Sequence, residues 1–114
     1  KGMEAIFVES LTSARHYGVE DRVLASLQET FPSIDWNEQA SYFFMRVAQH
    51  GKRRAEEMRE VAVTVREAGL DPHVAAGTAE RQEWVARHKA SARLDEVGKG
   101  ANWREYADRL LADR

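Results

Sequence analysis

The run HGKRR, from His50 to Arg54, is the densest group of side chains in this sequence that could do chemistry. The guanidinium groups of Arg53 and Arg54 are suited to carboxylates and phosphates, which arginine binds through paired hydrogen bonds. A glycine inside a helical pattern also marks a place where the helix can break and expose backbone amides. The run therefore indicates a binding site for an anion. The other interpretation is a solvated helix face, because Arg53 and Glu57 have the spacing of a helical ion pair.

The remaining reactive side chains form no complete active site. The four histidines lack the i, i+4 spacing of a helical metal site, and the motif HExxH is absent. Gly98-Lys99-Gly100 lacks the pattern of a phosphate-binding loop, and no serine stands in a nucleophile elbow. We therefore expect neither a catalytic residue nor a metal site within this chain.

The composition fits a single domain and argues against two classes of partner. The 114 residues are 43% hydrophobic and include 17 basic and 19 acidic side chains, which gives a net charge of −2. Such interspersed charge lacks the basic footprint of a protein that binds nucleic acid, and no uncharged run is long enough to span a membrane. The sequence has no cysteine, which fits a reducing compartment, and we expect the cytoplasm. We expect no nucleic-acid partner and no membrane partner.

The elements that must position the HGKRR run are helices, and one of them is unusually long. Apolar residues recur every three or four positions from Asp35 to Gly69, with Asp35 as the expected N-cap. An unbroken helix here would be about 50 Å long, whereas a domain of this size should have a radius of gyration of about 13 Å. We therefore expect the helix either to bend or break, with Gly51 as the candidate position, or to run along a surface made by more than this chain.

Shorter helices are expected around the long one, and no alternating strand pattern occurs. Their expected ranges are Gly2–Tyr17 with Gly18 as C-cap, Glu20–Thr30, a helix from its N-cap Asp71 to about Ala90, and a last helix capped by Asn102. The residues expected to face inward are Met3, Ile6, Phe7, Leu11 and Ala14; Val23, Leu24, Leu27 and Phe31; Val74, Ala75, Thr78, Ala79, Val85 and Ala86; and Trp103, Tyr106, Ala107, Leu110 and Leu111. The residues expected on the polar side of the first helix are Glu4, Ser10, Ser13 and Arg15. The expected fold class is all-α, with five to six helices around one long central helix or helix pair.

Three blocks of the sequence resemble a known family. The blocks are KGMEAIFVESLTSARHYGVEDRVLASL, PSIDWNEQASYFFMRVAQHGKRRAEEMREVA and GLDPHVAAGTAERQEW. Together they resemble the helical C-terminal domain of NAD(P)-dependent dehydrogenases of the 6-phosphogluconate and 3-hydroxyisobutyrate dehydrogenase superfamily. The nearest branch is the poorly characterised group labelled as a phosphogluconate dehydrogenase-type C-terminal domain. The resemblance extends from Lys1 to Trp84, and the tail from Val85 lies outside it.

The resemblance implies that the chain is the substrate-binding and dimerisation domain of an NAD(P)-dependent hydroxyacid dehydrogenase-like oxidoreductase. The parent protein would carry an N-terminal Rossmann domain, which binds most of the NAD or NADP, and a catalytic lysine upstream of Lys1. The fragment alone would then not be catalytic. The partners implied are that Rossmann domain, a second copy of the chain in a homodimer, and a small acidic substrate.

The resemblance also bears on the HGKRR run. Relatives in the 3-hydroxyisobutyrate branch carry a Lys-Asp-Leu motif that reaches the cofactor side of the cleft, and its positions match the tripeptide Glu-Glu-Met at 56–58. Glutamate replaces the lysine here, so cationic groups about a turn away are the candidates to take its place. The residues implied to bind on the substrate or cofactor side are His50, Arg53, Arg54 and Glu57.

The alternative is a free-standing helical protein-interaction module without catalysis. It follows from the lack of a complete active site in the sequence. The long amphipathic element, together with Trp84, Trp103 and Tyr106, would then form the surface for a partner or a second copy.

Overall fold

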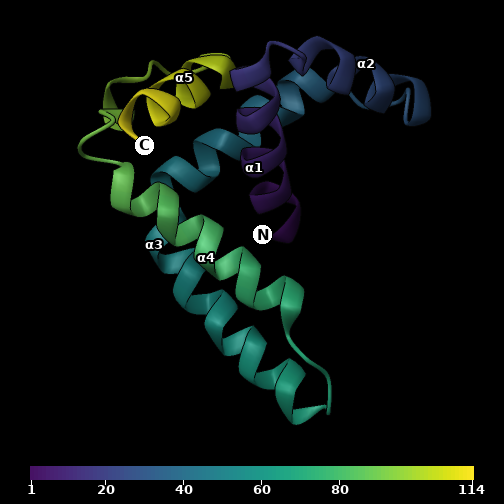
Figure 1. Ribbon diagram of the computed structural model, residues 1–114, viewed down its shortest axis with the longest axis vertical. Coiled ribbons are helices and arrows are strands. Elements are labelled where there is room, and N and C mark those ends of the chain that lie inside the picture. The colour runs from purple at the N-terminus through teal and green to yellow at the C-terminus, as the bar shows by residue number, and fades with distance from the viewer.

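The computed structural model describes all 114 residues and contains helices without strands (Figure 1). The elements are α1 (Gly2–Tyr17), α2 (Glu20–Thr30), α3 (Trp36–Glu67), α4 (His73–His88), the short 3-10 helix η1 (Leu94–Glu96) and α5 (Trp103–Asp113). The predicted all-α class with five to six helices is therefore confirmed. None of these helices combines the length and the apolar character that crossing a lipid bilayer requires.

The helix ends follow from local signals in the sequence. Gly18 ends α1 with a left-handed backbone at φ 69°, which glycine adopts without steric strain. The side chains of Asp35 and Asn102 cap α3 and α5 by accepting hydrogen bonds from backbone N–H groups of the first turn. The prediction that Asp71 caps α4 is wrong by one residue, because Pro72 occupies the N-cap position and no side chain caps this helix.

The long helix α3 continues without a break from Trp36 to Glu67, but it bends near its middle (Figure 1). Its first half passes behind α1 in this view, and its second half runs alongside α4 as a helical hairpin. Gly51 is buried between the two helices of this hairpin. A Cβ atom at Gly51 would lie 2.8 Å from the backbone carbonyl oxygen of Gln82. Glycine at this position therefore permits α3 and α4 to approach closely.

The hydrophobic core lies where α1, the first half of α3 and α5 meet. Phe7 stacks on Trp36 with ring centroids 5.6 Å apart, and Phe44 packs on Trp103 at 5.5 Å. Trp103 and Tyr106 are both buried, because the apolar face of α5 packs into this core. The prediction that these two residues belong to an exposed partner surface is therefore wrong.

The inward face of α1 is rotated from the predicted one. Phe7 is buried as expected, but the side chains of Met3 and Ile6 are 58% and 60% exposed. Glu4 was expected on the polar side of the helix and is buried instead. Its burial is possible because Arg54 of α3 pairs with the carboxylate.

Two other residues predicted to face inward are exposed. Phe31 follows the last residue of α2, so its ring reaches only the edge of the core, 5.9 Å from the ring of Trp36. Val74 is 74% exposed because it lies in the first turn of α4, at the end of the hairpin that extends away from the other helices (Figure 1).

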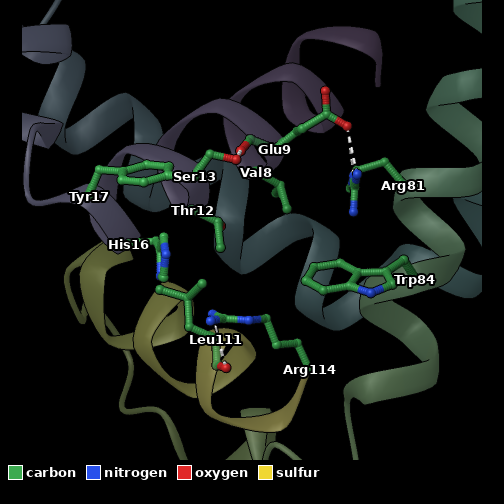
Figure 2. Close-up of a pocket in the computed structure, with 10 residues that line it drawn as sticks. All are labelled: Val8, Glu9, Thr12, Ser13, His16, Tyr17, Arg81, Trp84, Leu111 and Arg114. Atoms are coloured by element: carbon green, nitrogen blue, oxygen red, sulfur yellow. Dashed lines mark hydrogen bonds and ion pairs between the residues drawn. The ribbon is translucent and has the colours of Figure 1, made fainter.

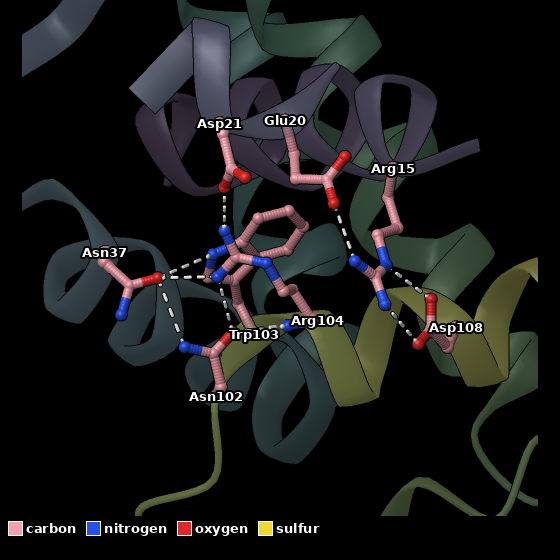
Figure 3. Close-up of polar contacts among 8 residues, drawn as sticks. All are labelled: Arg15, Glu20, Asp21, Asn37, Asn102, Trp103, Arg104 and Asp108. Atoms are coloured by element: carbon pink, nitrogen blue, oxygen red, sulfur yellow. Dashed lines mark hydrogen bonds and ion pairs between the residues drawn. The ribbon is translucent and has the colours of Figure 1, made fainter. Parts of the chain in front are cut away.

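Polar side chains fasten α5 to the rest of the fold (Figure 3). Arg15 of α1 donates two hydrogen bonds to Asp108 of α5, at 2.9 and 3.1 Å, and a third to Glu20 at 2.6 Å. These hydrogen bonds, first to Asp108 and then to Glu20, raise the pKa of Arg15 above its already high ordinary value. The guanidinium is therefore charged at every pH at which the fold exists.

Asn37, in the first turn of α3, makes the second connection to α5 (Figure 3). Its Oδ1 accepts hydrogen bonds from the indole N–H of Trp103 at 3.2 Å and from the guanidinium of Arg104 at 2.9 Å. Trp103 is fully buried, so Asn37 supplies the partner that a buried indole N–H requires.

Candidate functional site

The four residues predicted for the site lie on successive turns in the middle of α3. The side chains of the two arginines differ in their exposure to solvent. The side chain of Arg53 is 63% exposed, whereas Arg54 is buried. His50 and Glu57 are partly buried. Only part of the predicted site is thus available to a ligand from solvent.

Arg54 belongs to a buried polar cluster that joins α1, α3 and α4. This junction cluster consists of Glu4, Arg54 and Gln82. The Nε and Nη2 atoms of Arg54 donate to the two carboxylate oxygens of Glu4, each at 2.9 Å. The side-chain nitrogen of Gln82 donates to Oε1 of Glu4 and to the backbone carbonyl of Lys1, both at 3.3 Å. Arg54 therefore joins α3 to α1 through a bidentate, buried ion pair, and Gln82 joins α4 to the same carboxylate.

Glu57 lies at the edge of this junction, between two cations. Its carboxylate pairs with Nζ of Lys1 and lies 3.5 Å from Nε of Arg53. The hydrogen bond from Lys1, and then the charges of Lys1 and the arginines, lower the pKa of Glu57. Glu57 is consequently ionised at neutral pH and neutralises nearby cations, which does not suit it to act as a general acid there.

His50 is surrounded by positive charge. Its pKa is lowered first by burial and then by nearby cations, of which Arg53 has the largest effect. The imidazole is therefore neutral at physiological pH and offers one N–H donor and one acceptor nitrogen. The other cations that act on it are Arg46, Arg54 and Lys89. A shallow hollow of about 380 Å³ lies beside the ring, lined by Gln49, His50, Lys52, Arg53 and Glu56.

The surroundings of His50 are rich in cationic side chains, but they do not form a complete catalytic site. The hollow contains no serine, threonine or tyrosine that the imidazole could activate. No group of three or more histidine, aspartate or glutamate side chains is placed to hold a metal ion. An all-helical chain also lacks the βαβ unit that cradles a dinucleotide.

Sequence reasoning missed two members of the junction cluster, Glu4 and Gln82. Glu4 was placed on the polar side because the apolar stripe was drawn through Met3 and Ile6. A stripe drawn through Val8 and Leu11 would have put Glu4 on the inward face. Gln82 offered no comparable signal, because its partners lie 78 or more positions earlier in the chain.

A serine, a histidine and an aspartate meet where the end of α4 approaches the end of α5. Nδ1 of His88 lies 2.7 Å from Oδ2 of Asp113, and the hydroxyl of Ser91 donates to the same oxygen at 2.5 Å. In a catalytic triad the serine hydroxyl is bonded to the histidine, whereas here both side chains bind the aspartate. This group therefore fastens α5 to α4 and is not a nucleophilic site.

Two other hollows lie outside the predicted site. One is an apolar groove of about 650 Å³ between α1 and α2, here called the α1–α2 groove. Its walls include Ile6, Val19, Val23 and Leu27. The other has a volume of about 320 Å³ and lies between α1, α4 and α5 (Figure 2).

Comparison with known proteins gives a family model and a solved structure. Residues 14–85 match the model described as Domain of unknown function (DUF1932). A conserved hypothetical protein from Sinorhizobium meliloti 1021 has a similar structure, with a TM-score of 0.84 and 34% sequence identity. The similarity covers 99% of this chain and 37% of that protein, so the chain spans little more than a third of its length. None of the curated proteins matches the sequence.

Proposed function

The chain belongs to the DUF1932 family, and on that premise we propose that it is the helical substrate-binding and dimerisation domain of an NAD(P)-dependent hydroxyacid dehydrogenase-like oxidoreductase. The proposal is supported by the three sequence blocks that resemble the C-terminal domains of the 6-phosphogluconate and 3-hydroxyisobutyrate dehydrogenase superfamily. It is also supported by the greater length of the similar Sinorhizobium meliloti protein, which leaves ample room for a further domain.

The observation that carries this proposal is the concentration of cations around His50. Arg53 is exposed beside the neutral imidazole, and a hollow of about 380 Å³ adjoins both side chains. A small acidic substrate, or a phosphate group of the cofactor, matches this environment in charge and in hydrogen-bonding capacity. Arg53 would bind the anion and His50 would orient it, while Arg54 and Glu4 keep the supporting helices in place.

NAD or NADP would be bound mainly by an N-terminal Rossmann domain of the parent protein. The donor set of this chain fits only an anionic part of such a cofactor, because the chain has cationic side chains but no dinucleotide-binding unit. When bound, the nicotinamide supplies hydride transfer. The residues of this chain would position the substrate and exclude water on the opposite side of the cleft.

The test is an assay of the parent protein with NAD or NADP and a panel of 2- and 3-hydroxyacids, in which the absorbance of the reduced nicotinamide measures the reaction rate. Arg53→Gln and His50→Gln should raise KM for the acid or the cofactor while the helix content stays unchanged. Arg66→Gln is the matched control, because this arginine is exposed near the end of α3, away from the hollow. A parent sequence without a nucleotide-binding domain before Lys1 would overturn the proposal, as would unaltered kinetics in both variants.

A homodimer is the second part of the proposal, and the α1–α2 groove is its proposed interface. The groove is predominantly apolar, and Ile6 in its wall and Met3, one turn earlier on α1, are largely exposed. A second copy that presents the same face would cover both grooves in an isologous contact. Sedimentation should then give a dimer that Ile6→Asp dissociates and that Val63→Asp, at the exposed hairpin, leaves intact.

The alternative function, a helical interaction module without catalysis, is favoured by the same groove. The two functions are distinguished by the dehydrogenase assay of the parent protein. A dimer in a parent that reduces neither cofactor with any hydroxyacid would favour the module. A monomer would exclude the groove as a self-association surface.

A further inference from the structure

The hollow between α1, α4 and α5 has the form of a small-molecule site (Figure 2). Figure 2 shows Thr12 and His16 of α1 on one side, Trp84 of α4 on another, and Leu111 and Arg114 at the end of the chain on a third. Its volume of about 320 Å³ is at the lower end of the range of about 300–1,000 Å³ that is typical of ligand pockets. None of the three residues of the junction cluster lines this hollow, so the two are distinct sites.

The buried hydroxyl of Thr12 is the feature of this hollow that favours a bound ligand. The residue is only 7% exposed, and its Oγ1 is buried without a hydrogen-bond partner. Buried hydroxyls nearly always have such a partner, and an unpaired one lowers stability. Because Thr12 lines the hollow, a molecule within it can supply the missing acceptor. The neighbouring hydroxyl of Ser13 is already used, since it donates to the carbonyl of Glu9 at 2.7 Å.

The charged groups around the hollow favour a ligand that accepts hydrogen bonds. Nε and Nη2 of Arg81 both donate to Oε1 of Glu9, at 3.2 and 2.6 Å, so these two charges neutralise each other. The guanidinium of Arg81 also lies over the ring of Trp84, 4.9 Å from its centroid, and forms one wall. Arg114 pairs with no carboxylate, and its Nη1 donates only to the carbonyl of Leu111, at 3.3 Å. Its positive charge is therefore available to an anion.

We propose that this hollow binds a small carboxylic acid with an apolar or aromatic body. The carboxylate would accept hydrogen bonds from Thr12 and Arg114, with His16 as a third polar neighbour. The body would pack on the apolar part of the lining, which is formed by Val8, Trp84 and Leu111. The site is additional to the proposed dehydrogenase role and does not depend on it.

The experiment is an NMR titration of the 114-residue chain with benzoate and, separately, with benzamide. The two probes have nearly the same shape, but benzamide lacks the charge. Benzoate should give saturable shifts at Thr12, His16 and the indole N–H of Trp84, with an affinity about tenfold higher than that of benzamide, as a charge-assisted hydrogen bond provides. Equal affinities, or no saturation by benzoate at millimolar concentration, would overturn the proposal and leave a hollow filled by water.

Variants test the two polar contacts separately. Thr12→Val should weaken benzoate binding by roughly threefold to tenfold while the melting temperature stays the same or rises, because the substitution removes an unpaired buried hydroxyl. Arg114→Gln should weaken binding by about tenfold, the effect of losing a charge-assisted hydrogen bond. Arg66→Gln, the matched control, should bind benzoate like the unsubstituted chain. Undiminished affinity in Thr12→Val, in a chain that still gives a folded spectrum, would contradict the proposed site.

Discussion

Gly51 of α3 lies so close to α4 that a Cβ atom there would be 2.8 Å from the carbonyl oxygen of Gln82. The atom in the way belongs to the backbone of a packed helix, so it cannot move as the end of a flexible side chain could. The contact between these two residues therefore determines how closely the helices of the hairpin pack. The residue type at position 51 follows from this contact and not from helix propensity, which disfavours glycine.

The first prediction compares the two glycines inside helices. Gly51→Ala should destabilise the fold by about 1–3 kcal/mol, because the extra methyl group forces α3 and α4 apart. Gly77→Ala should instead stabilise it by about 0.5–1 kcal/mol, since a Cβ atom there meets nothing within 4 Å and alanine favours the helix. Urea unfolding of both variants measures the two effects. A stability gain for Gly51→Ala would mean that the helices pack less closely than the structure shows.

The second prediction concerns the two adjacent arginines of α3. Arg54→Ala should destabilise the fold by about 3–5 kcal/mol, because it leaves the buried carboxylate of Glu4 without its partner. Arg53→Ala should change the free energy of unfolding by less than about 0.5 kcal/mol, since that side chain is exposed. Chemical denaturation of both variants provides the comparison. Similar values for the two would contradict the buried ion pair.

A double variant isolates the ion pair from simple packing. Glu4→Gln/Arg54→Met removes both charges and keeps side chains of similar length, so no unpaired charge is buried. We expect it to be more stable than Arg54→Met alone, which keeps the same volume at position 54 but leaves the carboxylate of Glu4 unpaired, because breaking a buried pair is worse than replacing it. The free energies of unfolding should rank in that order, and the reverse order would show that an unpaired buried charge is not the cause of the lost stability.

The third prediction concerns the hydrogen bonds that Asn37 accepts from α5. Asn37→Ala should destabilise the fold by about 1–3 kcal/mol, because it leaves the buried indole N–H of Trp103 unpaired. Asn37→Asp keeps the acceptor oxygen and places a negative charge beside Arg104, in the first turn of α3 where the helix dipole favours it. It should therefore retain the stability of the unsubstituted chain. Thermal unfolding followed by Trp fluorescence distinguishes the two variants.

The fourth prediction concerns pH. The hydrogen bond from Ser91, and then the one with His88, lower the pKa of Asp113 in the folded protein. Because the folded pKa lies below the unfolded value of about 3.9, the stabilisation is fully present above that pH and disappears as the pH falls through the folded pKa. Asp113→Asn should therefore lower the melting temperature near neutral pH, and the difference from the unsubstituted chain should vanish in strong acid.

The control for this pH dependence is Asp71→Asn. Asp71 is almost fully exposed and lies 3.8 Å from an equally exposed His73, so its replacement should leave the melting temperature nearly unchanged at every pH. A constant difference between Asp113→Asn and the unsubstituted chain across the acid range would show that the contact with α4 does not depend on ionisation.

Local signals were sufficient to predict the helices of this fold. Gly18, Asp35 and Asn102 act through contacts within a few residues, so the ends of α1, α3 and α5 could be read from the sequence. The start of α4 was misplaced by one residue, because proline there occupies the N-cap position that Asp71 was expected to take. The bend of α3 was expected from its length, whereas the close approach of α4 at Gly51 could not be predicted, because it depends on the backbone of a helix that is distant in the sequence.

The arrangement of the site was harder to predict because its contacts join distant parts of the chain. Arg54 was identified as a site residue, but its partner Glu4 lies 50 positions earlier and was assigned to the wrong face. The unpaired hydroxyl of Thr12 depends on three packed helices and has no signature in the sequence. His50, Arg53 and Glu57 were grouped by their spacing in the sequence and by the family resemblance, and their role in binding remains a prediction.

The bend in α3 gives its two halves very different protection from water. The first half packs against α1 and α5, whereas the distal end of the second half has α4 as its neighbour (Figure 1). Val61 and Val63 in this distal end, and Leu70 just after it, are exposed. A helix with so few apolar neighbours opens at a lower free energy than a helix inside the core. The backbone amides of residues 60–71 should therefore exchange with deuterium well before those of the first half. A protease that requires local unfolding should make its first cut in the same segment.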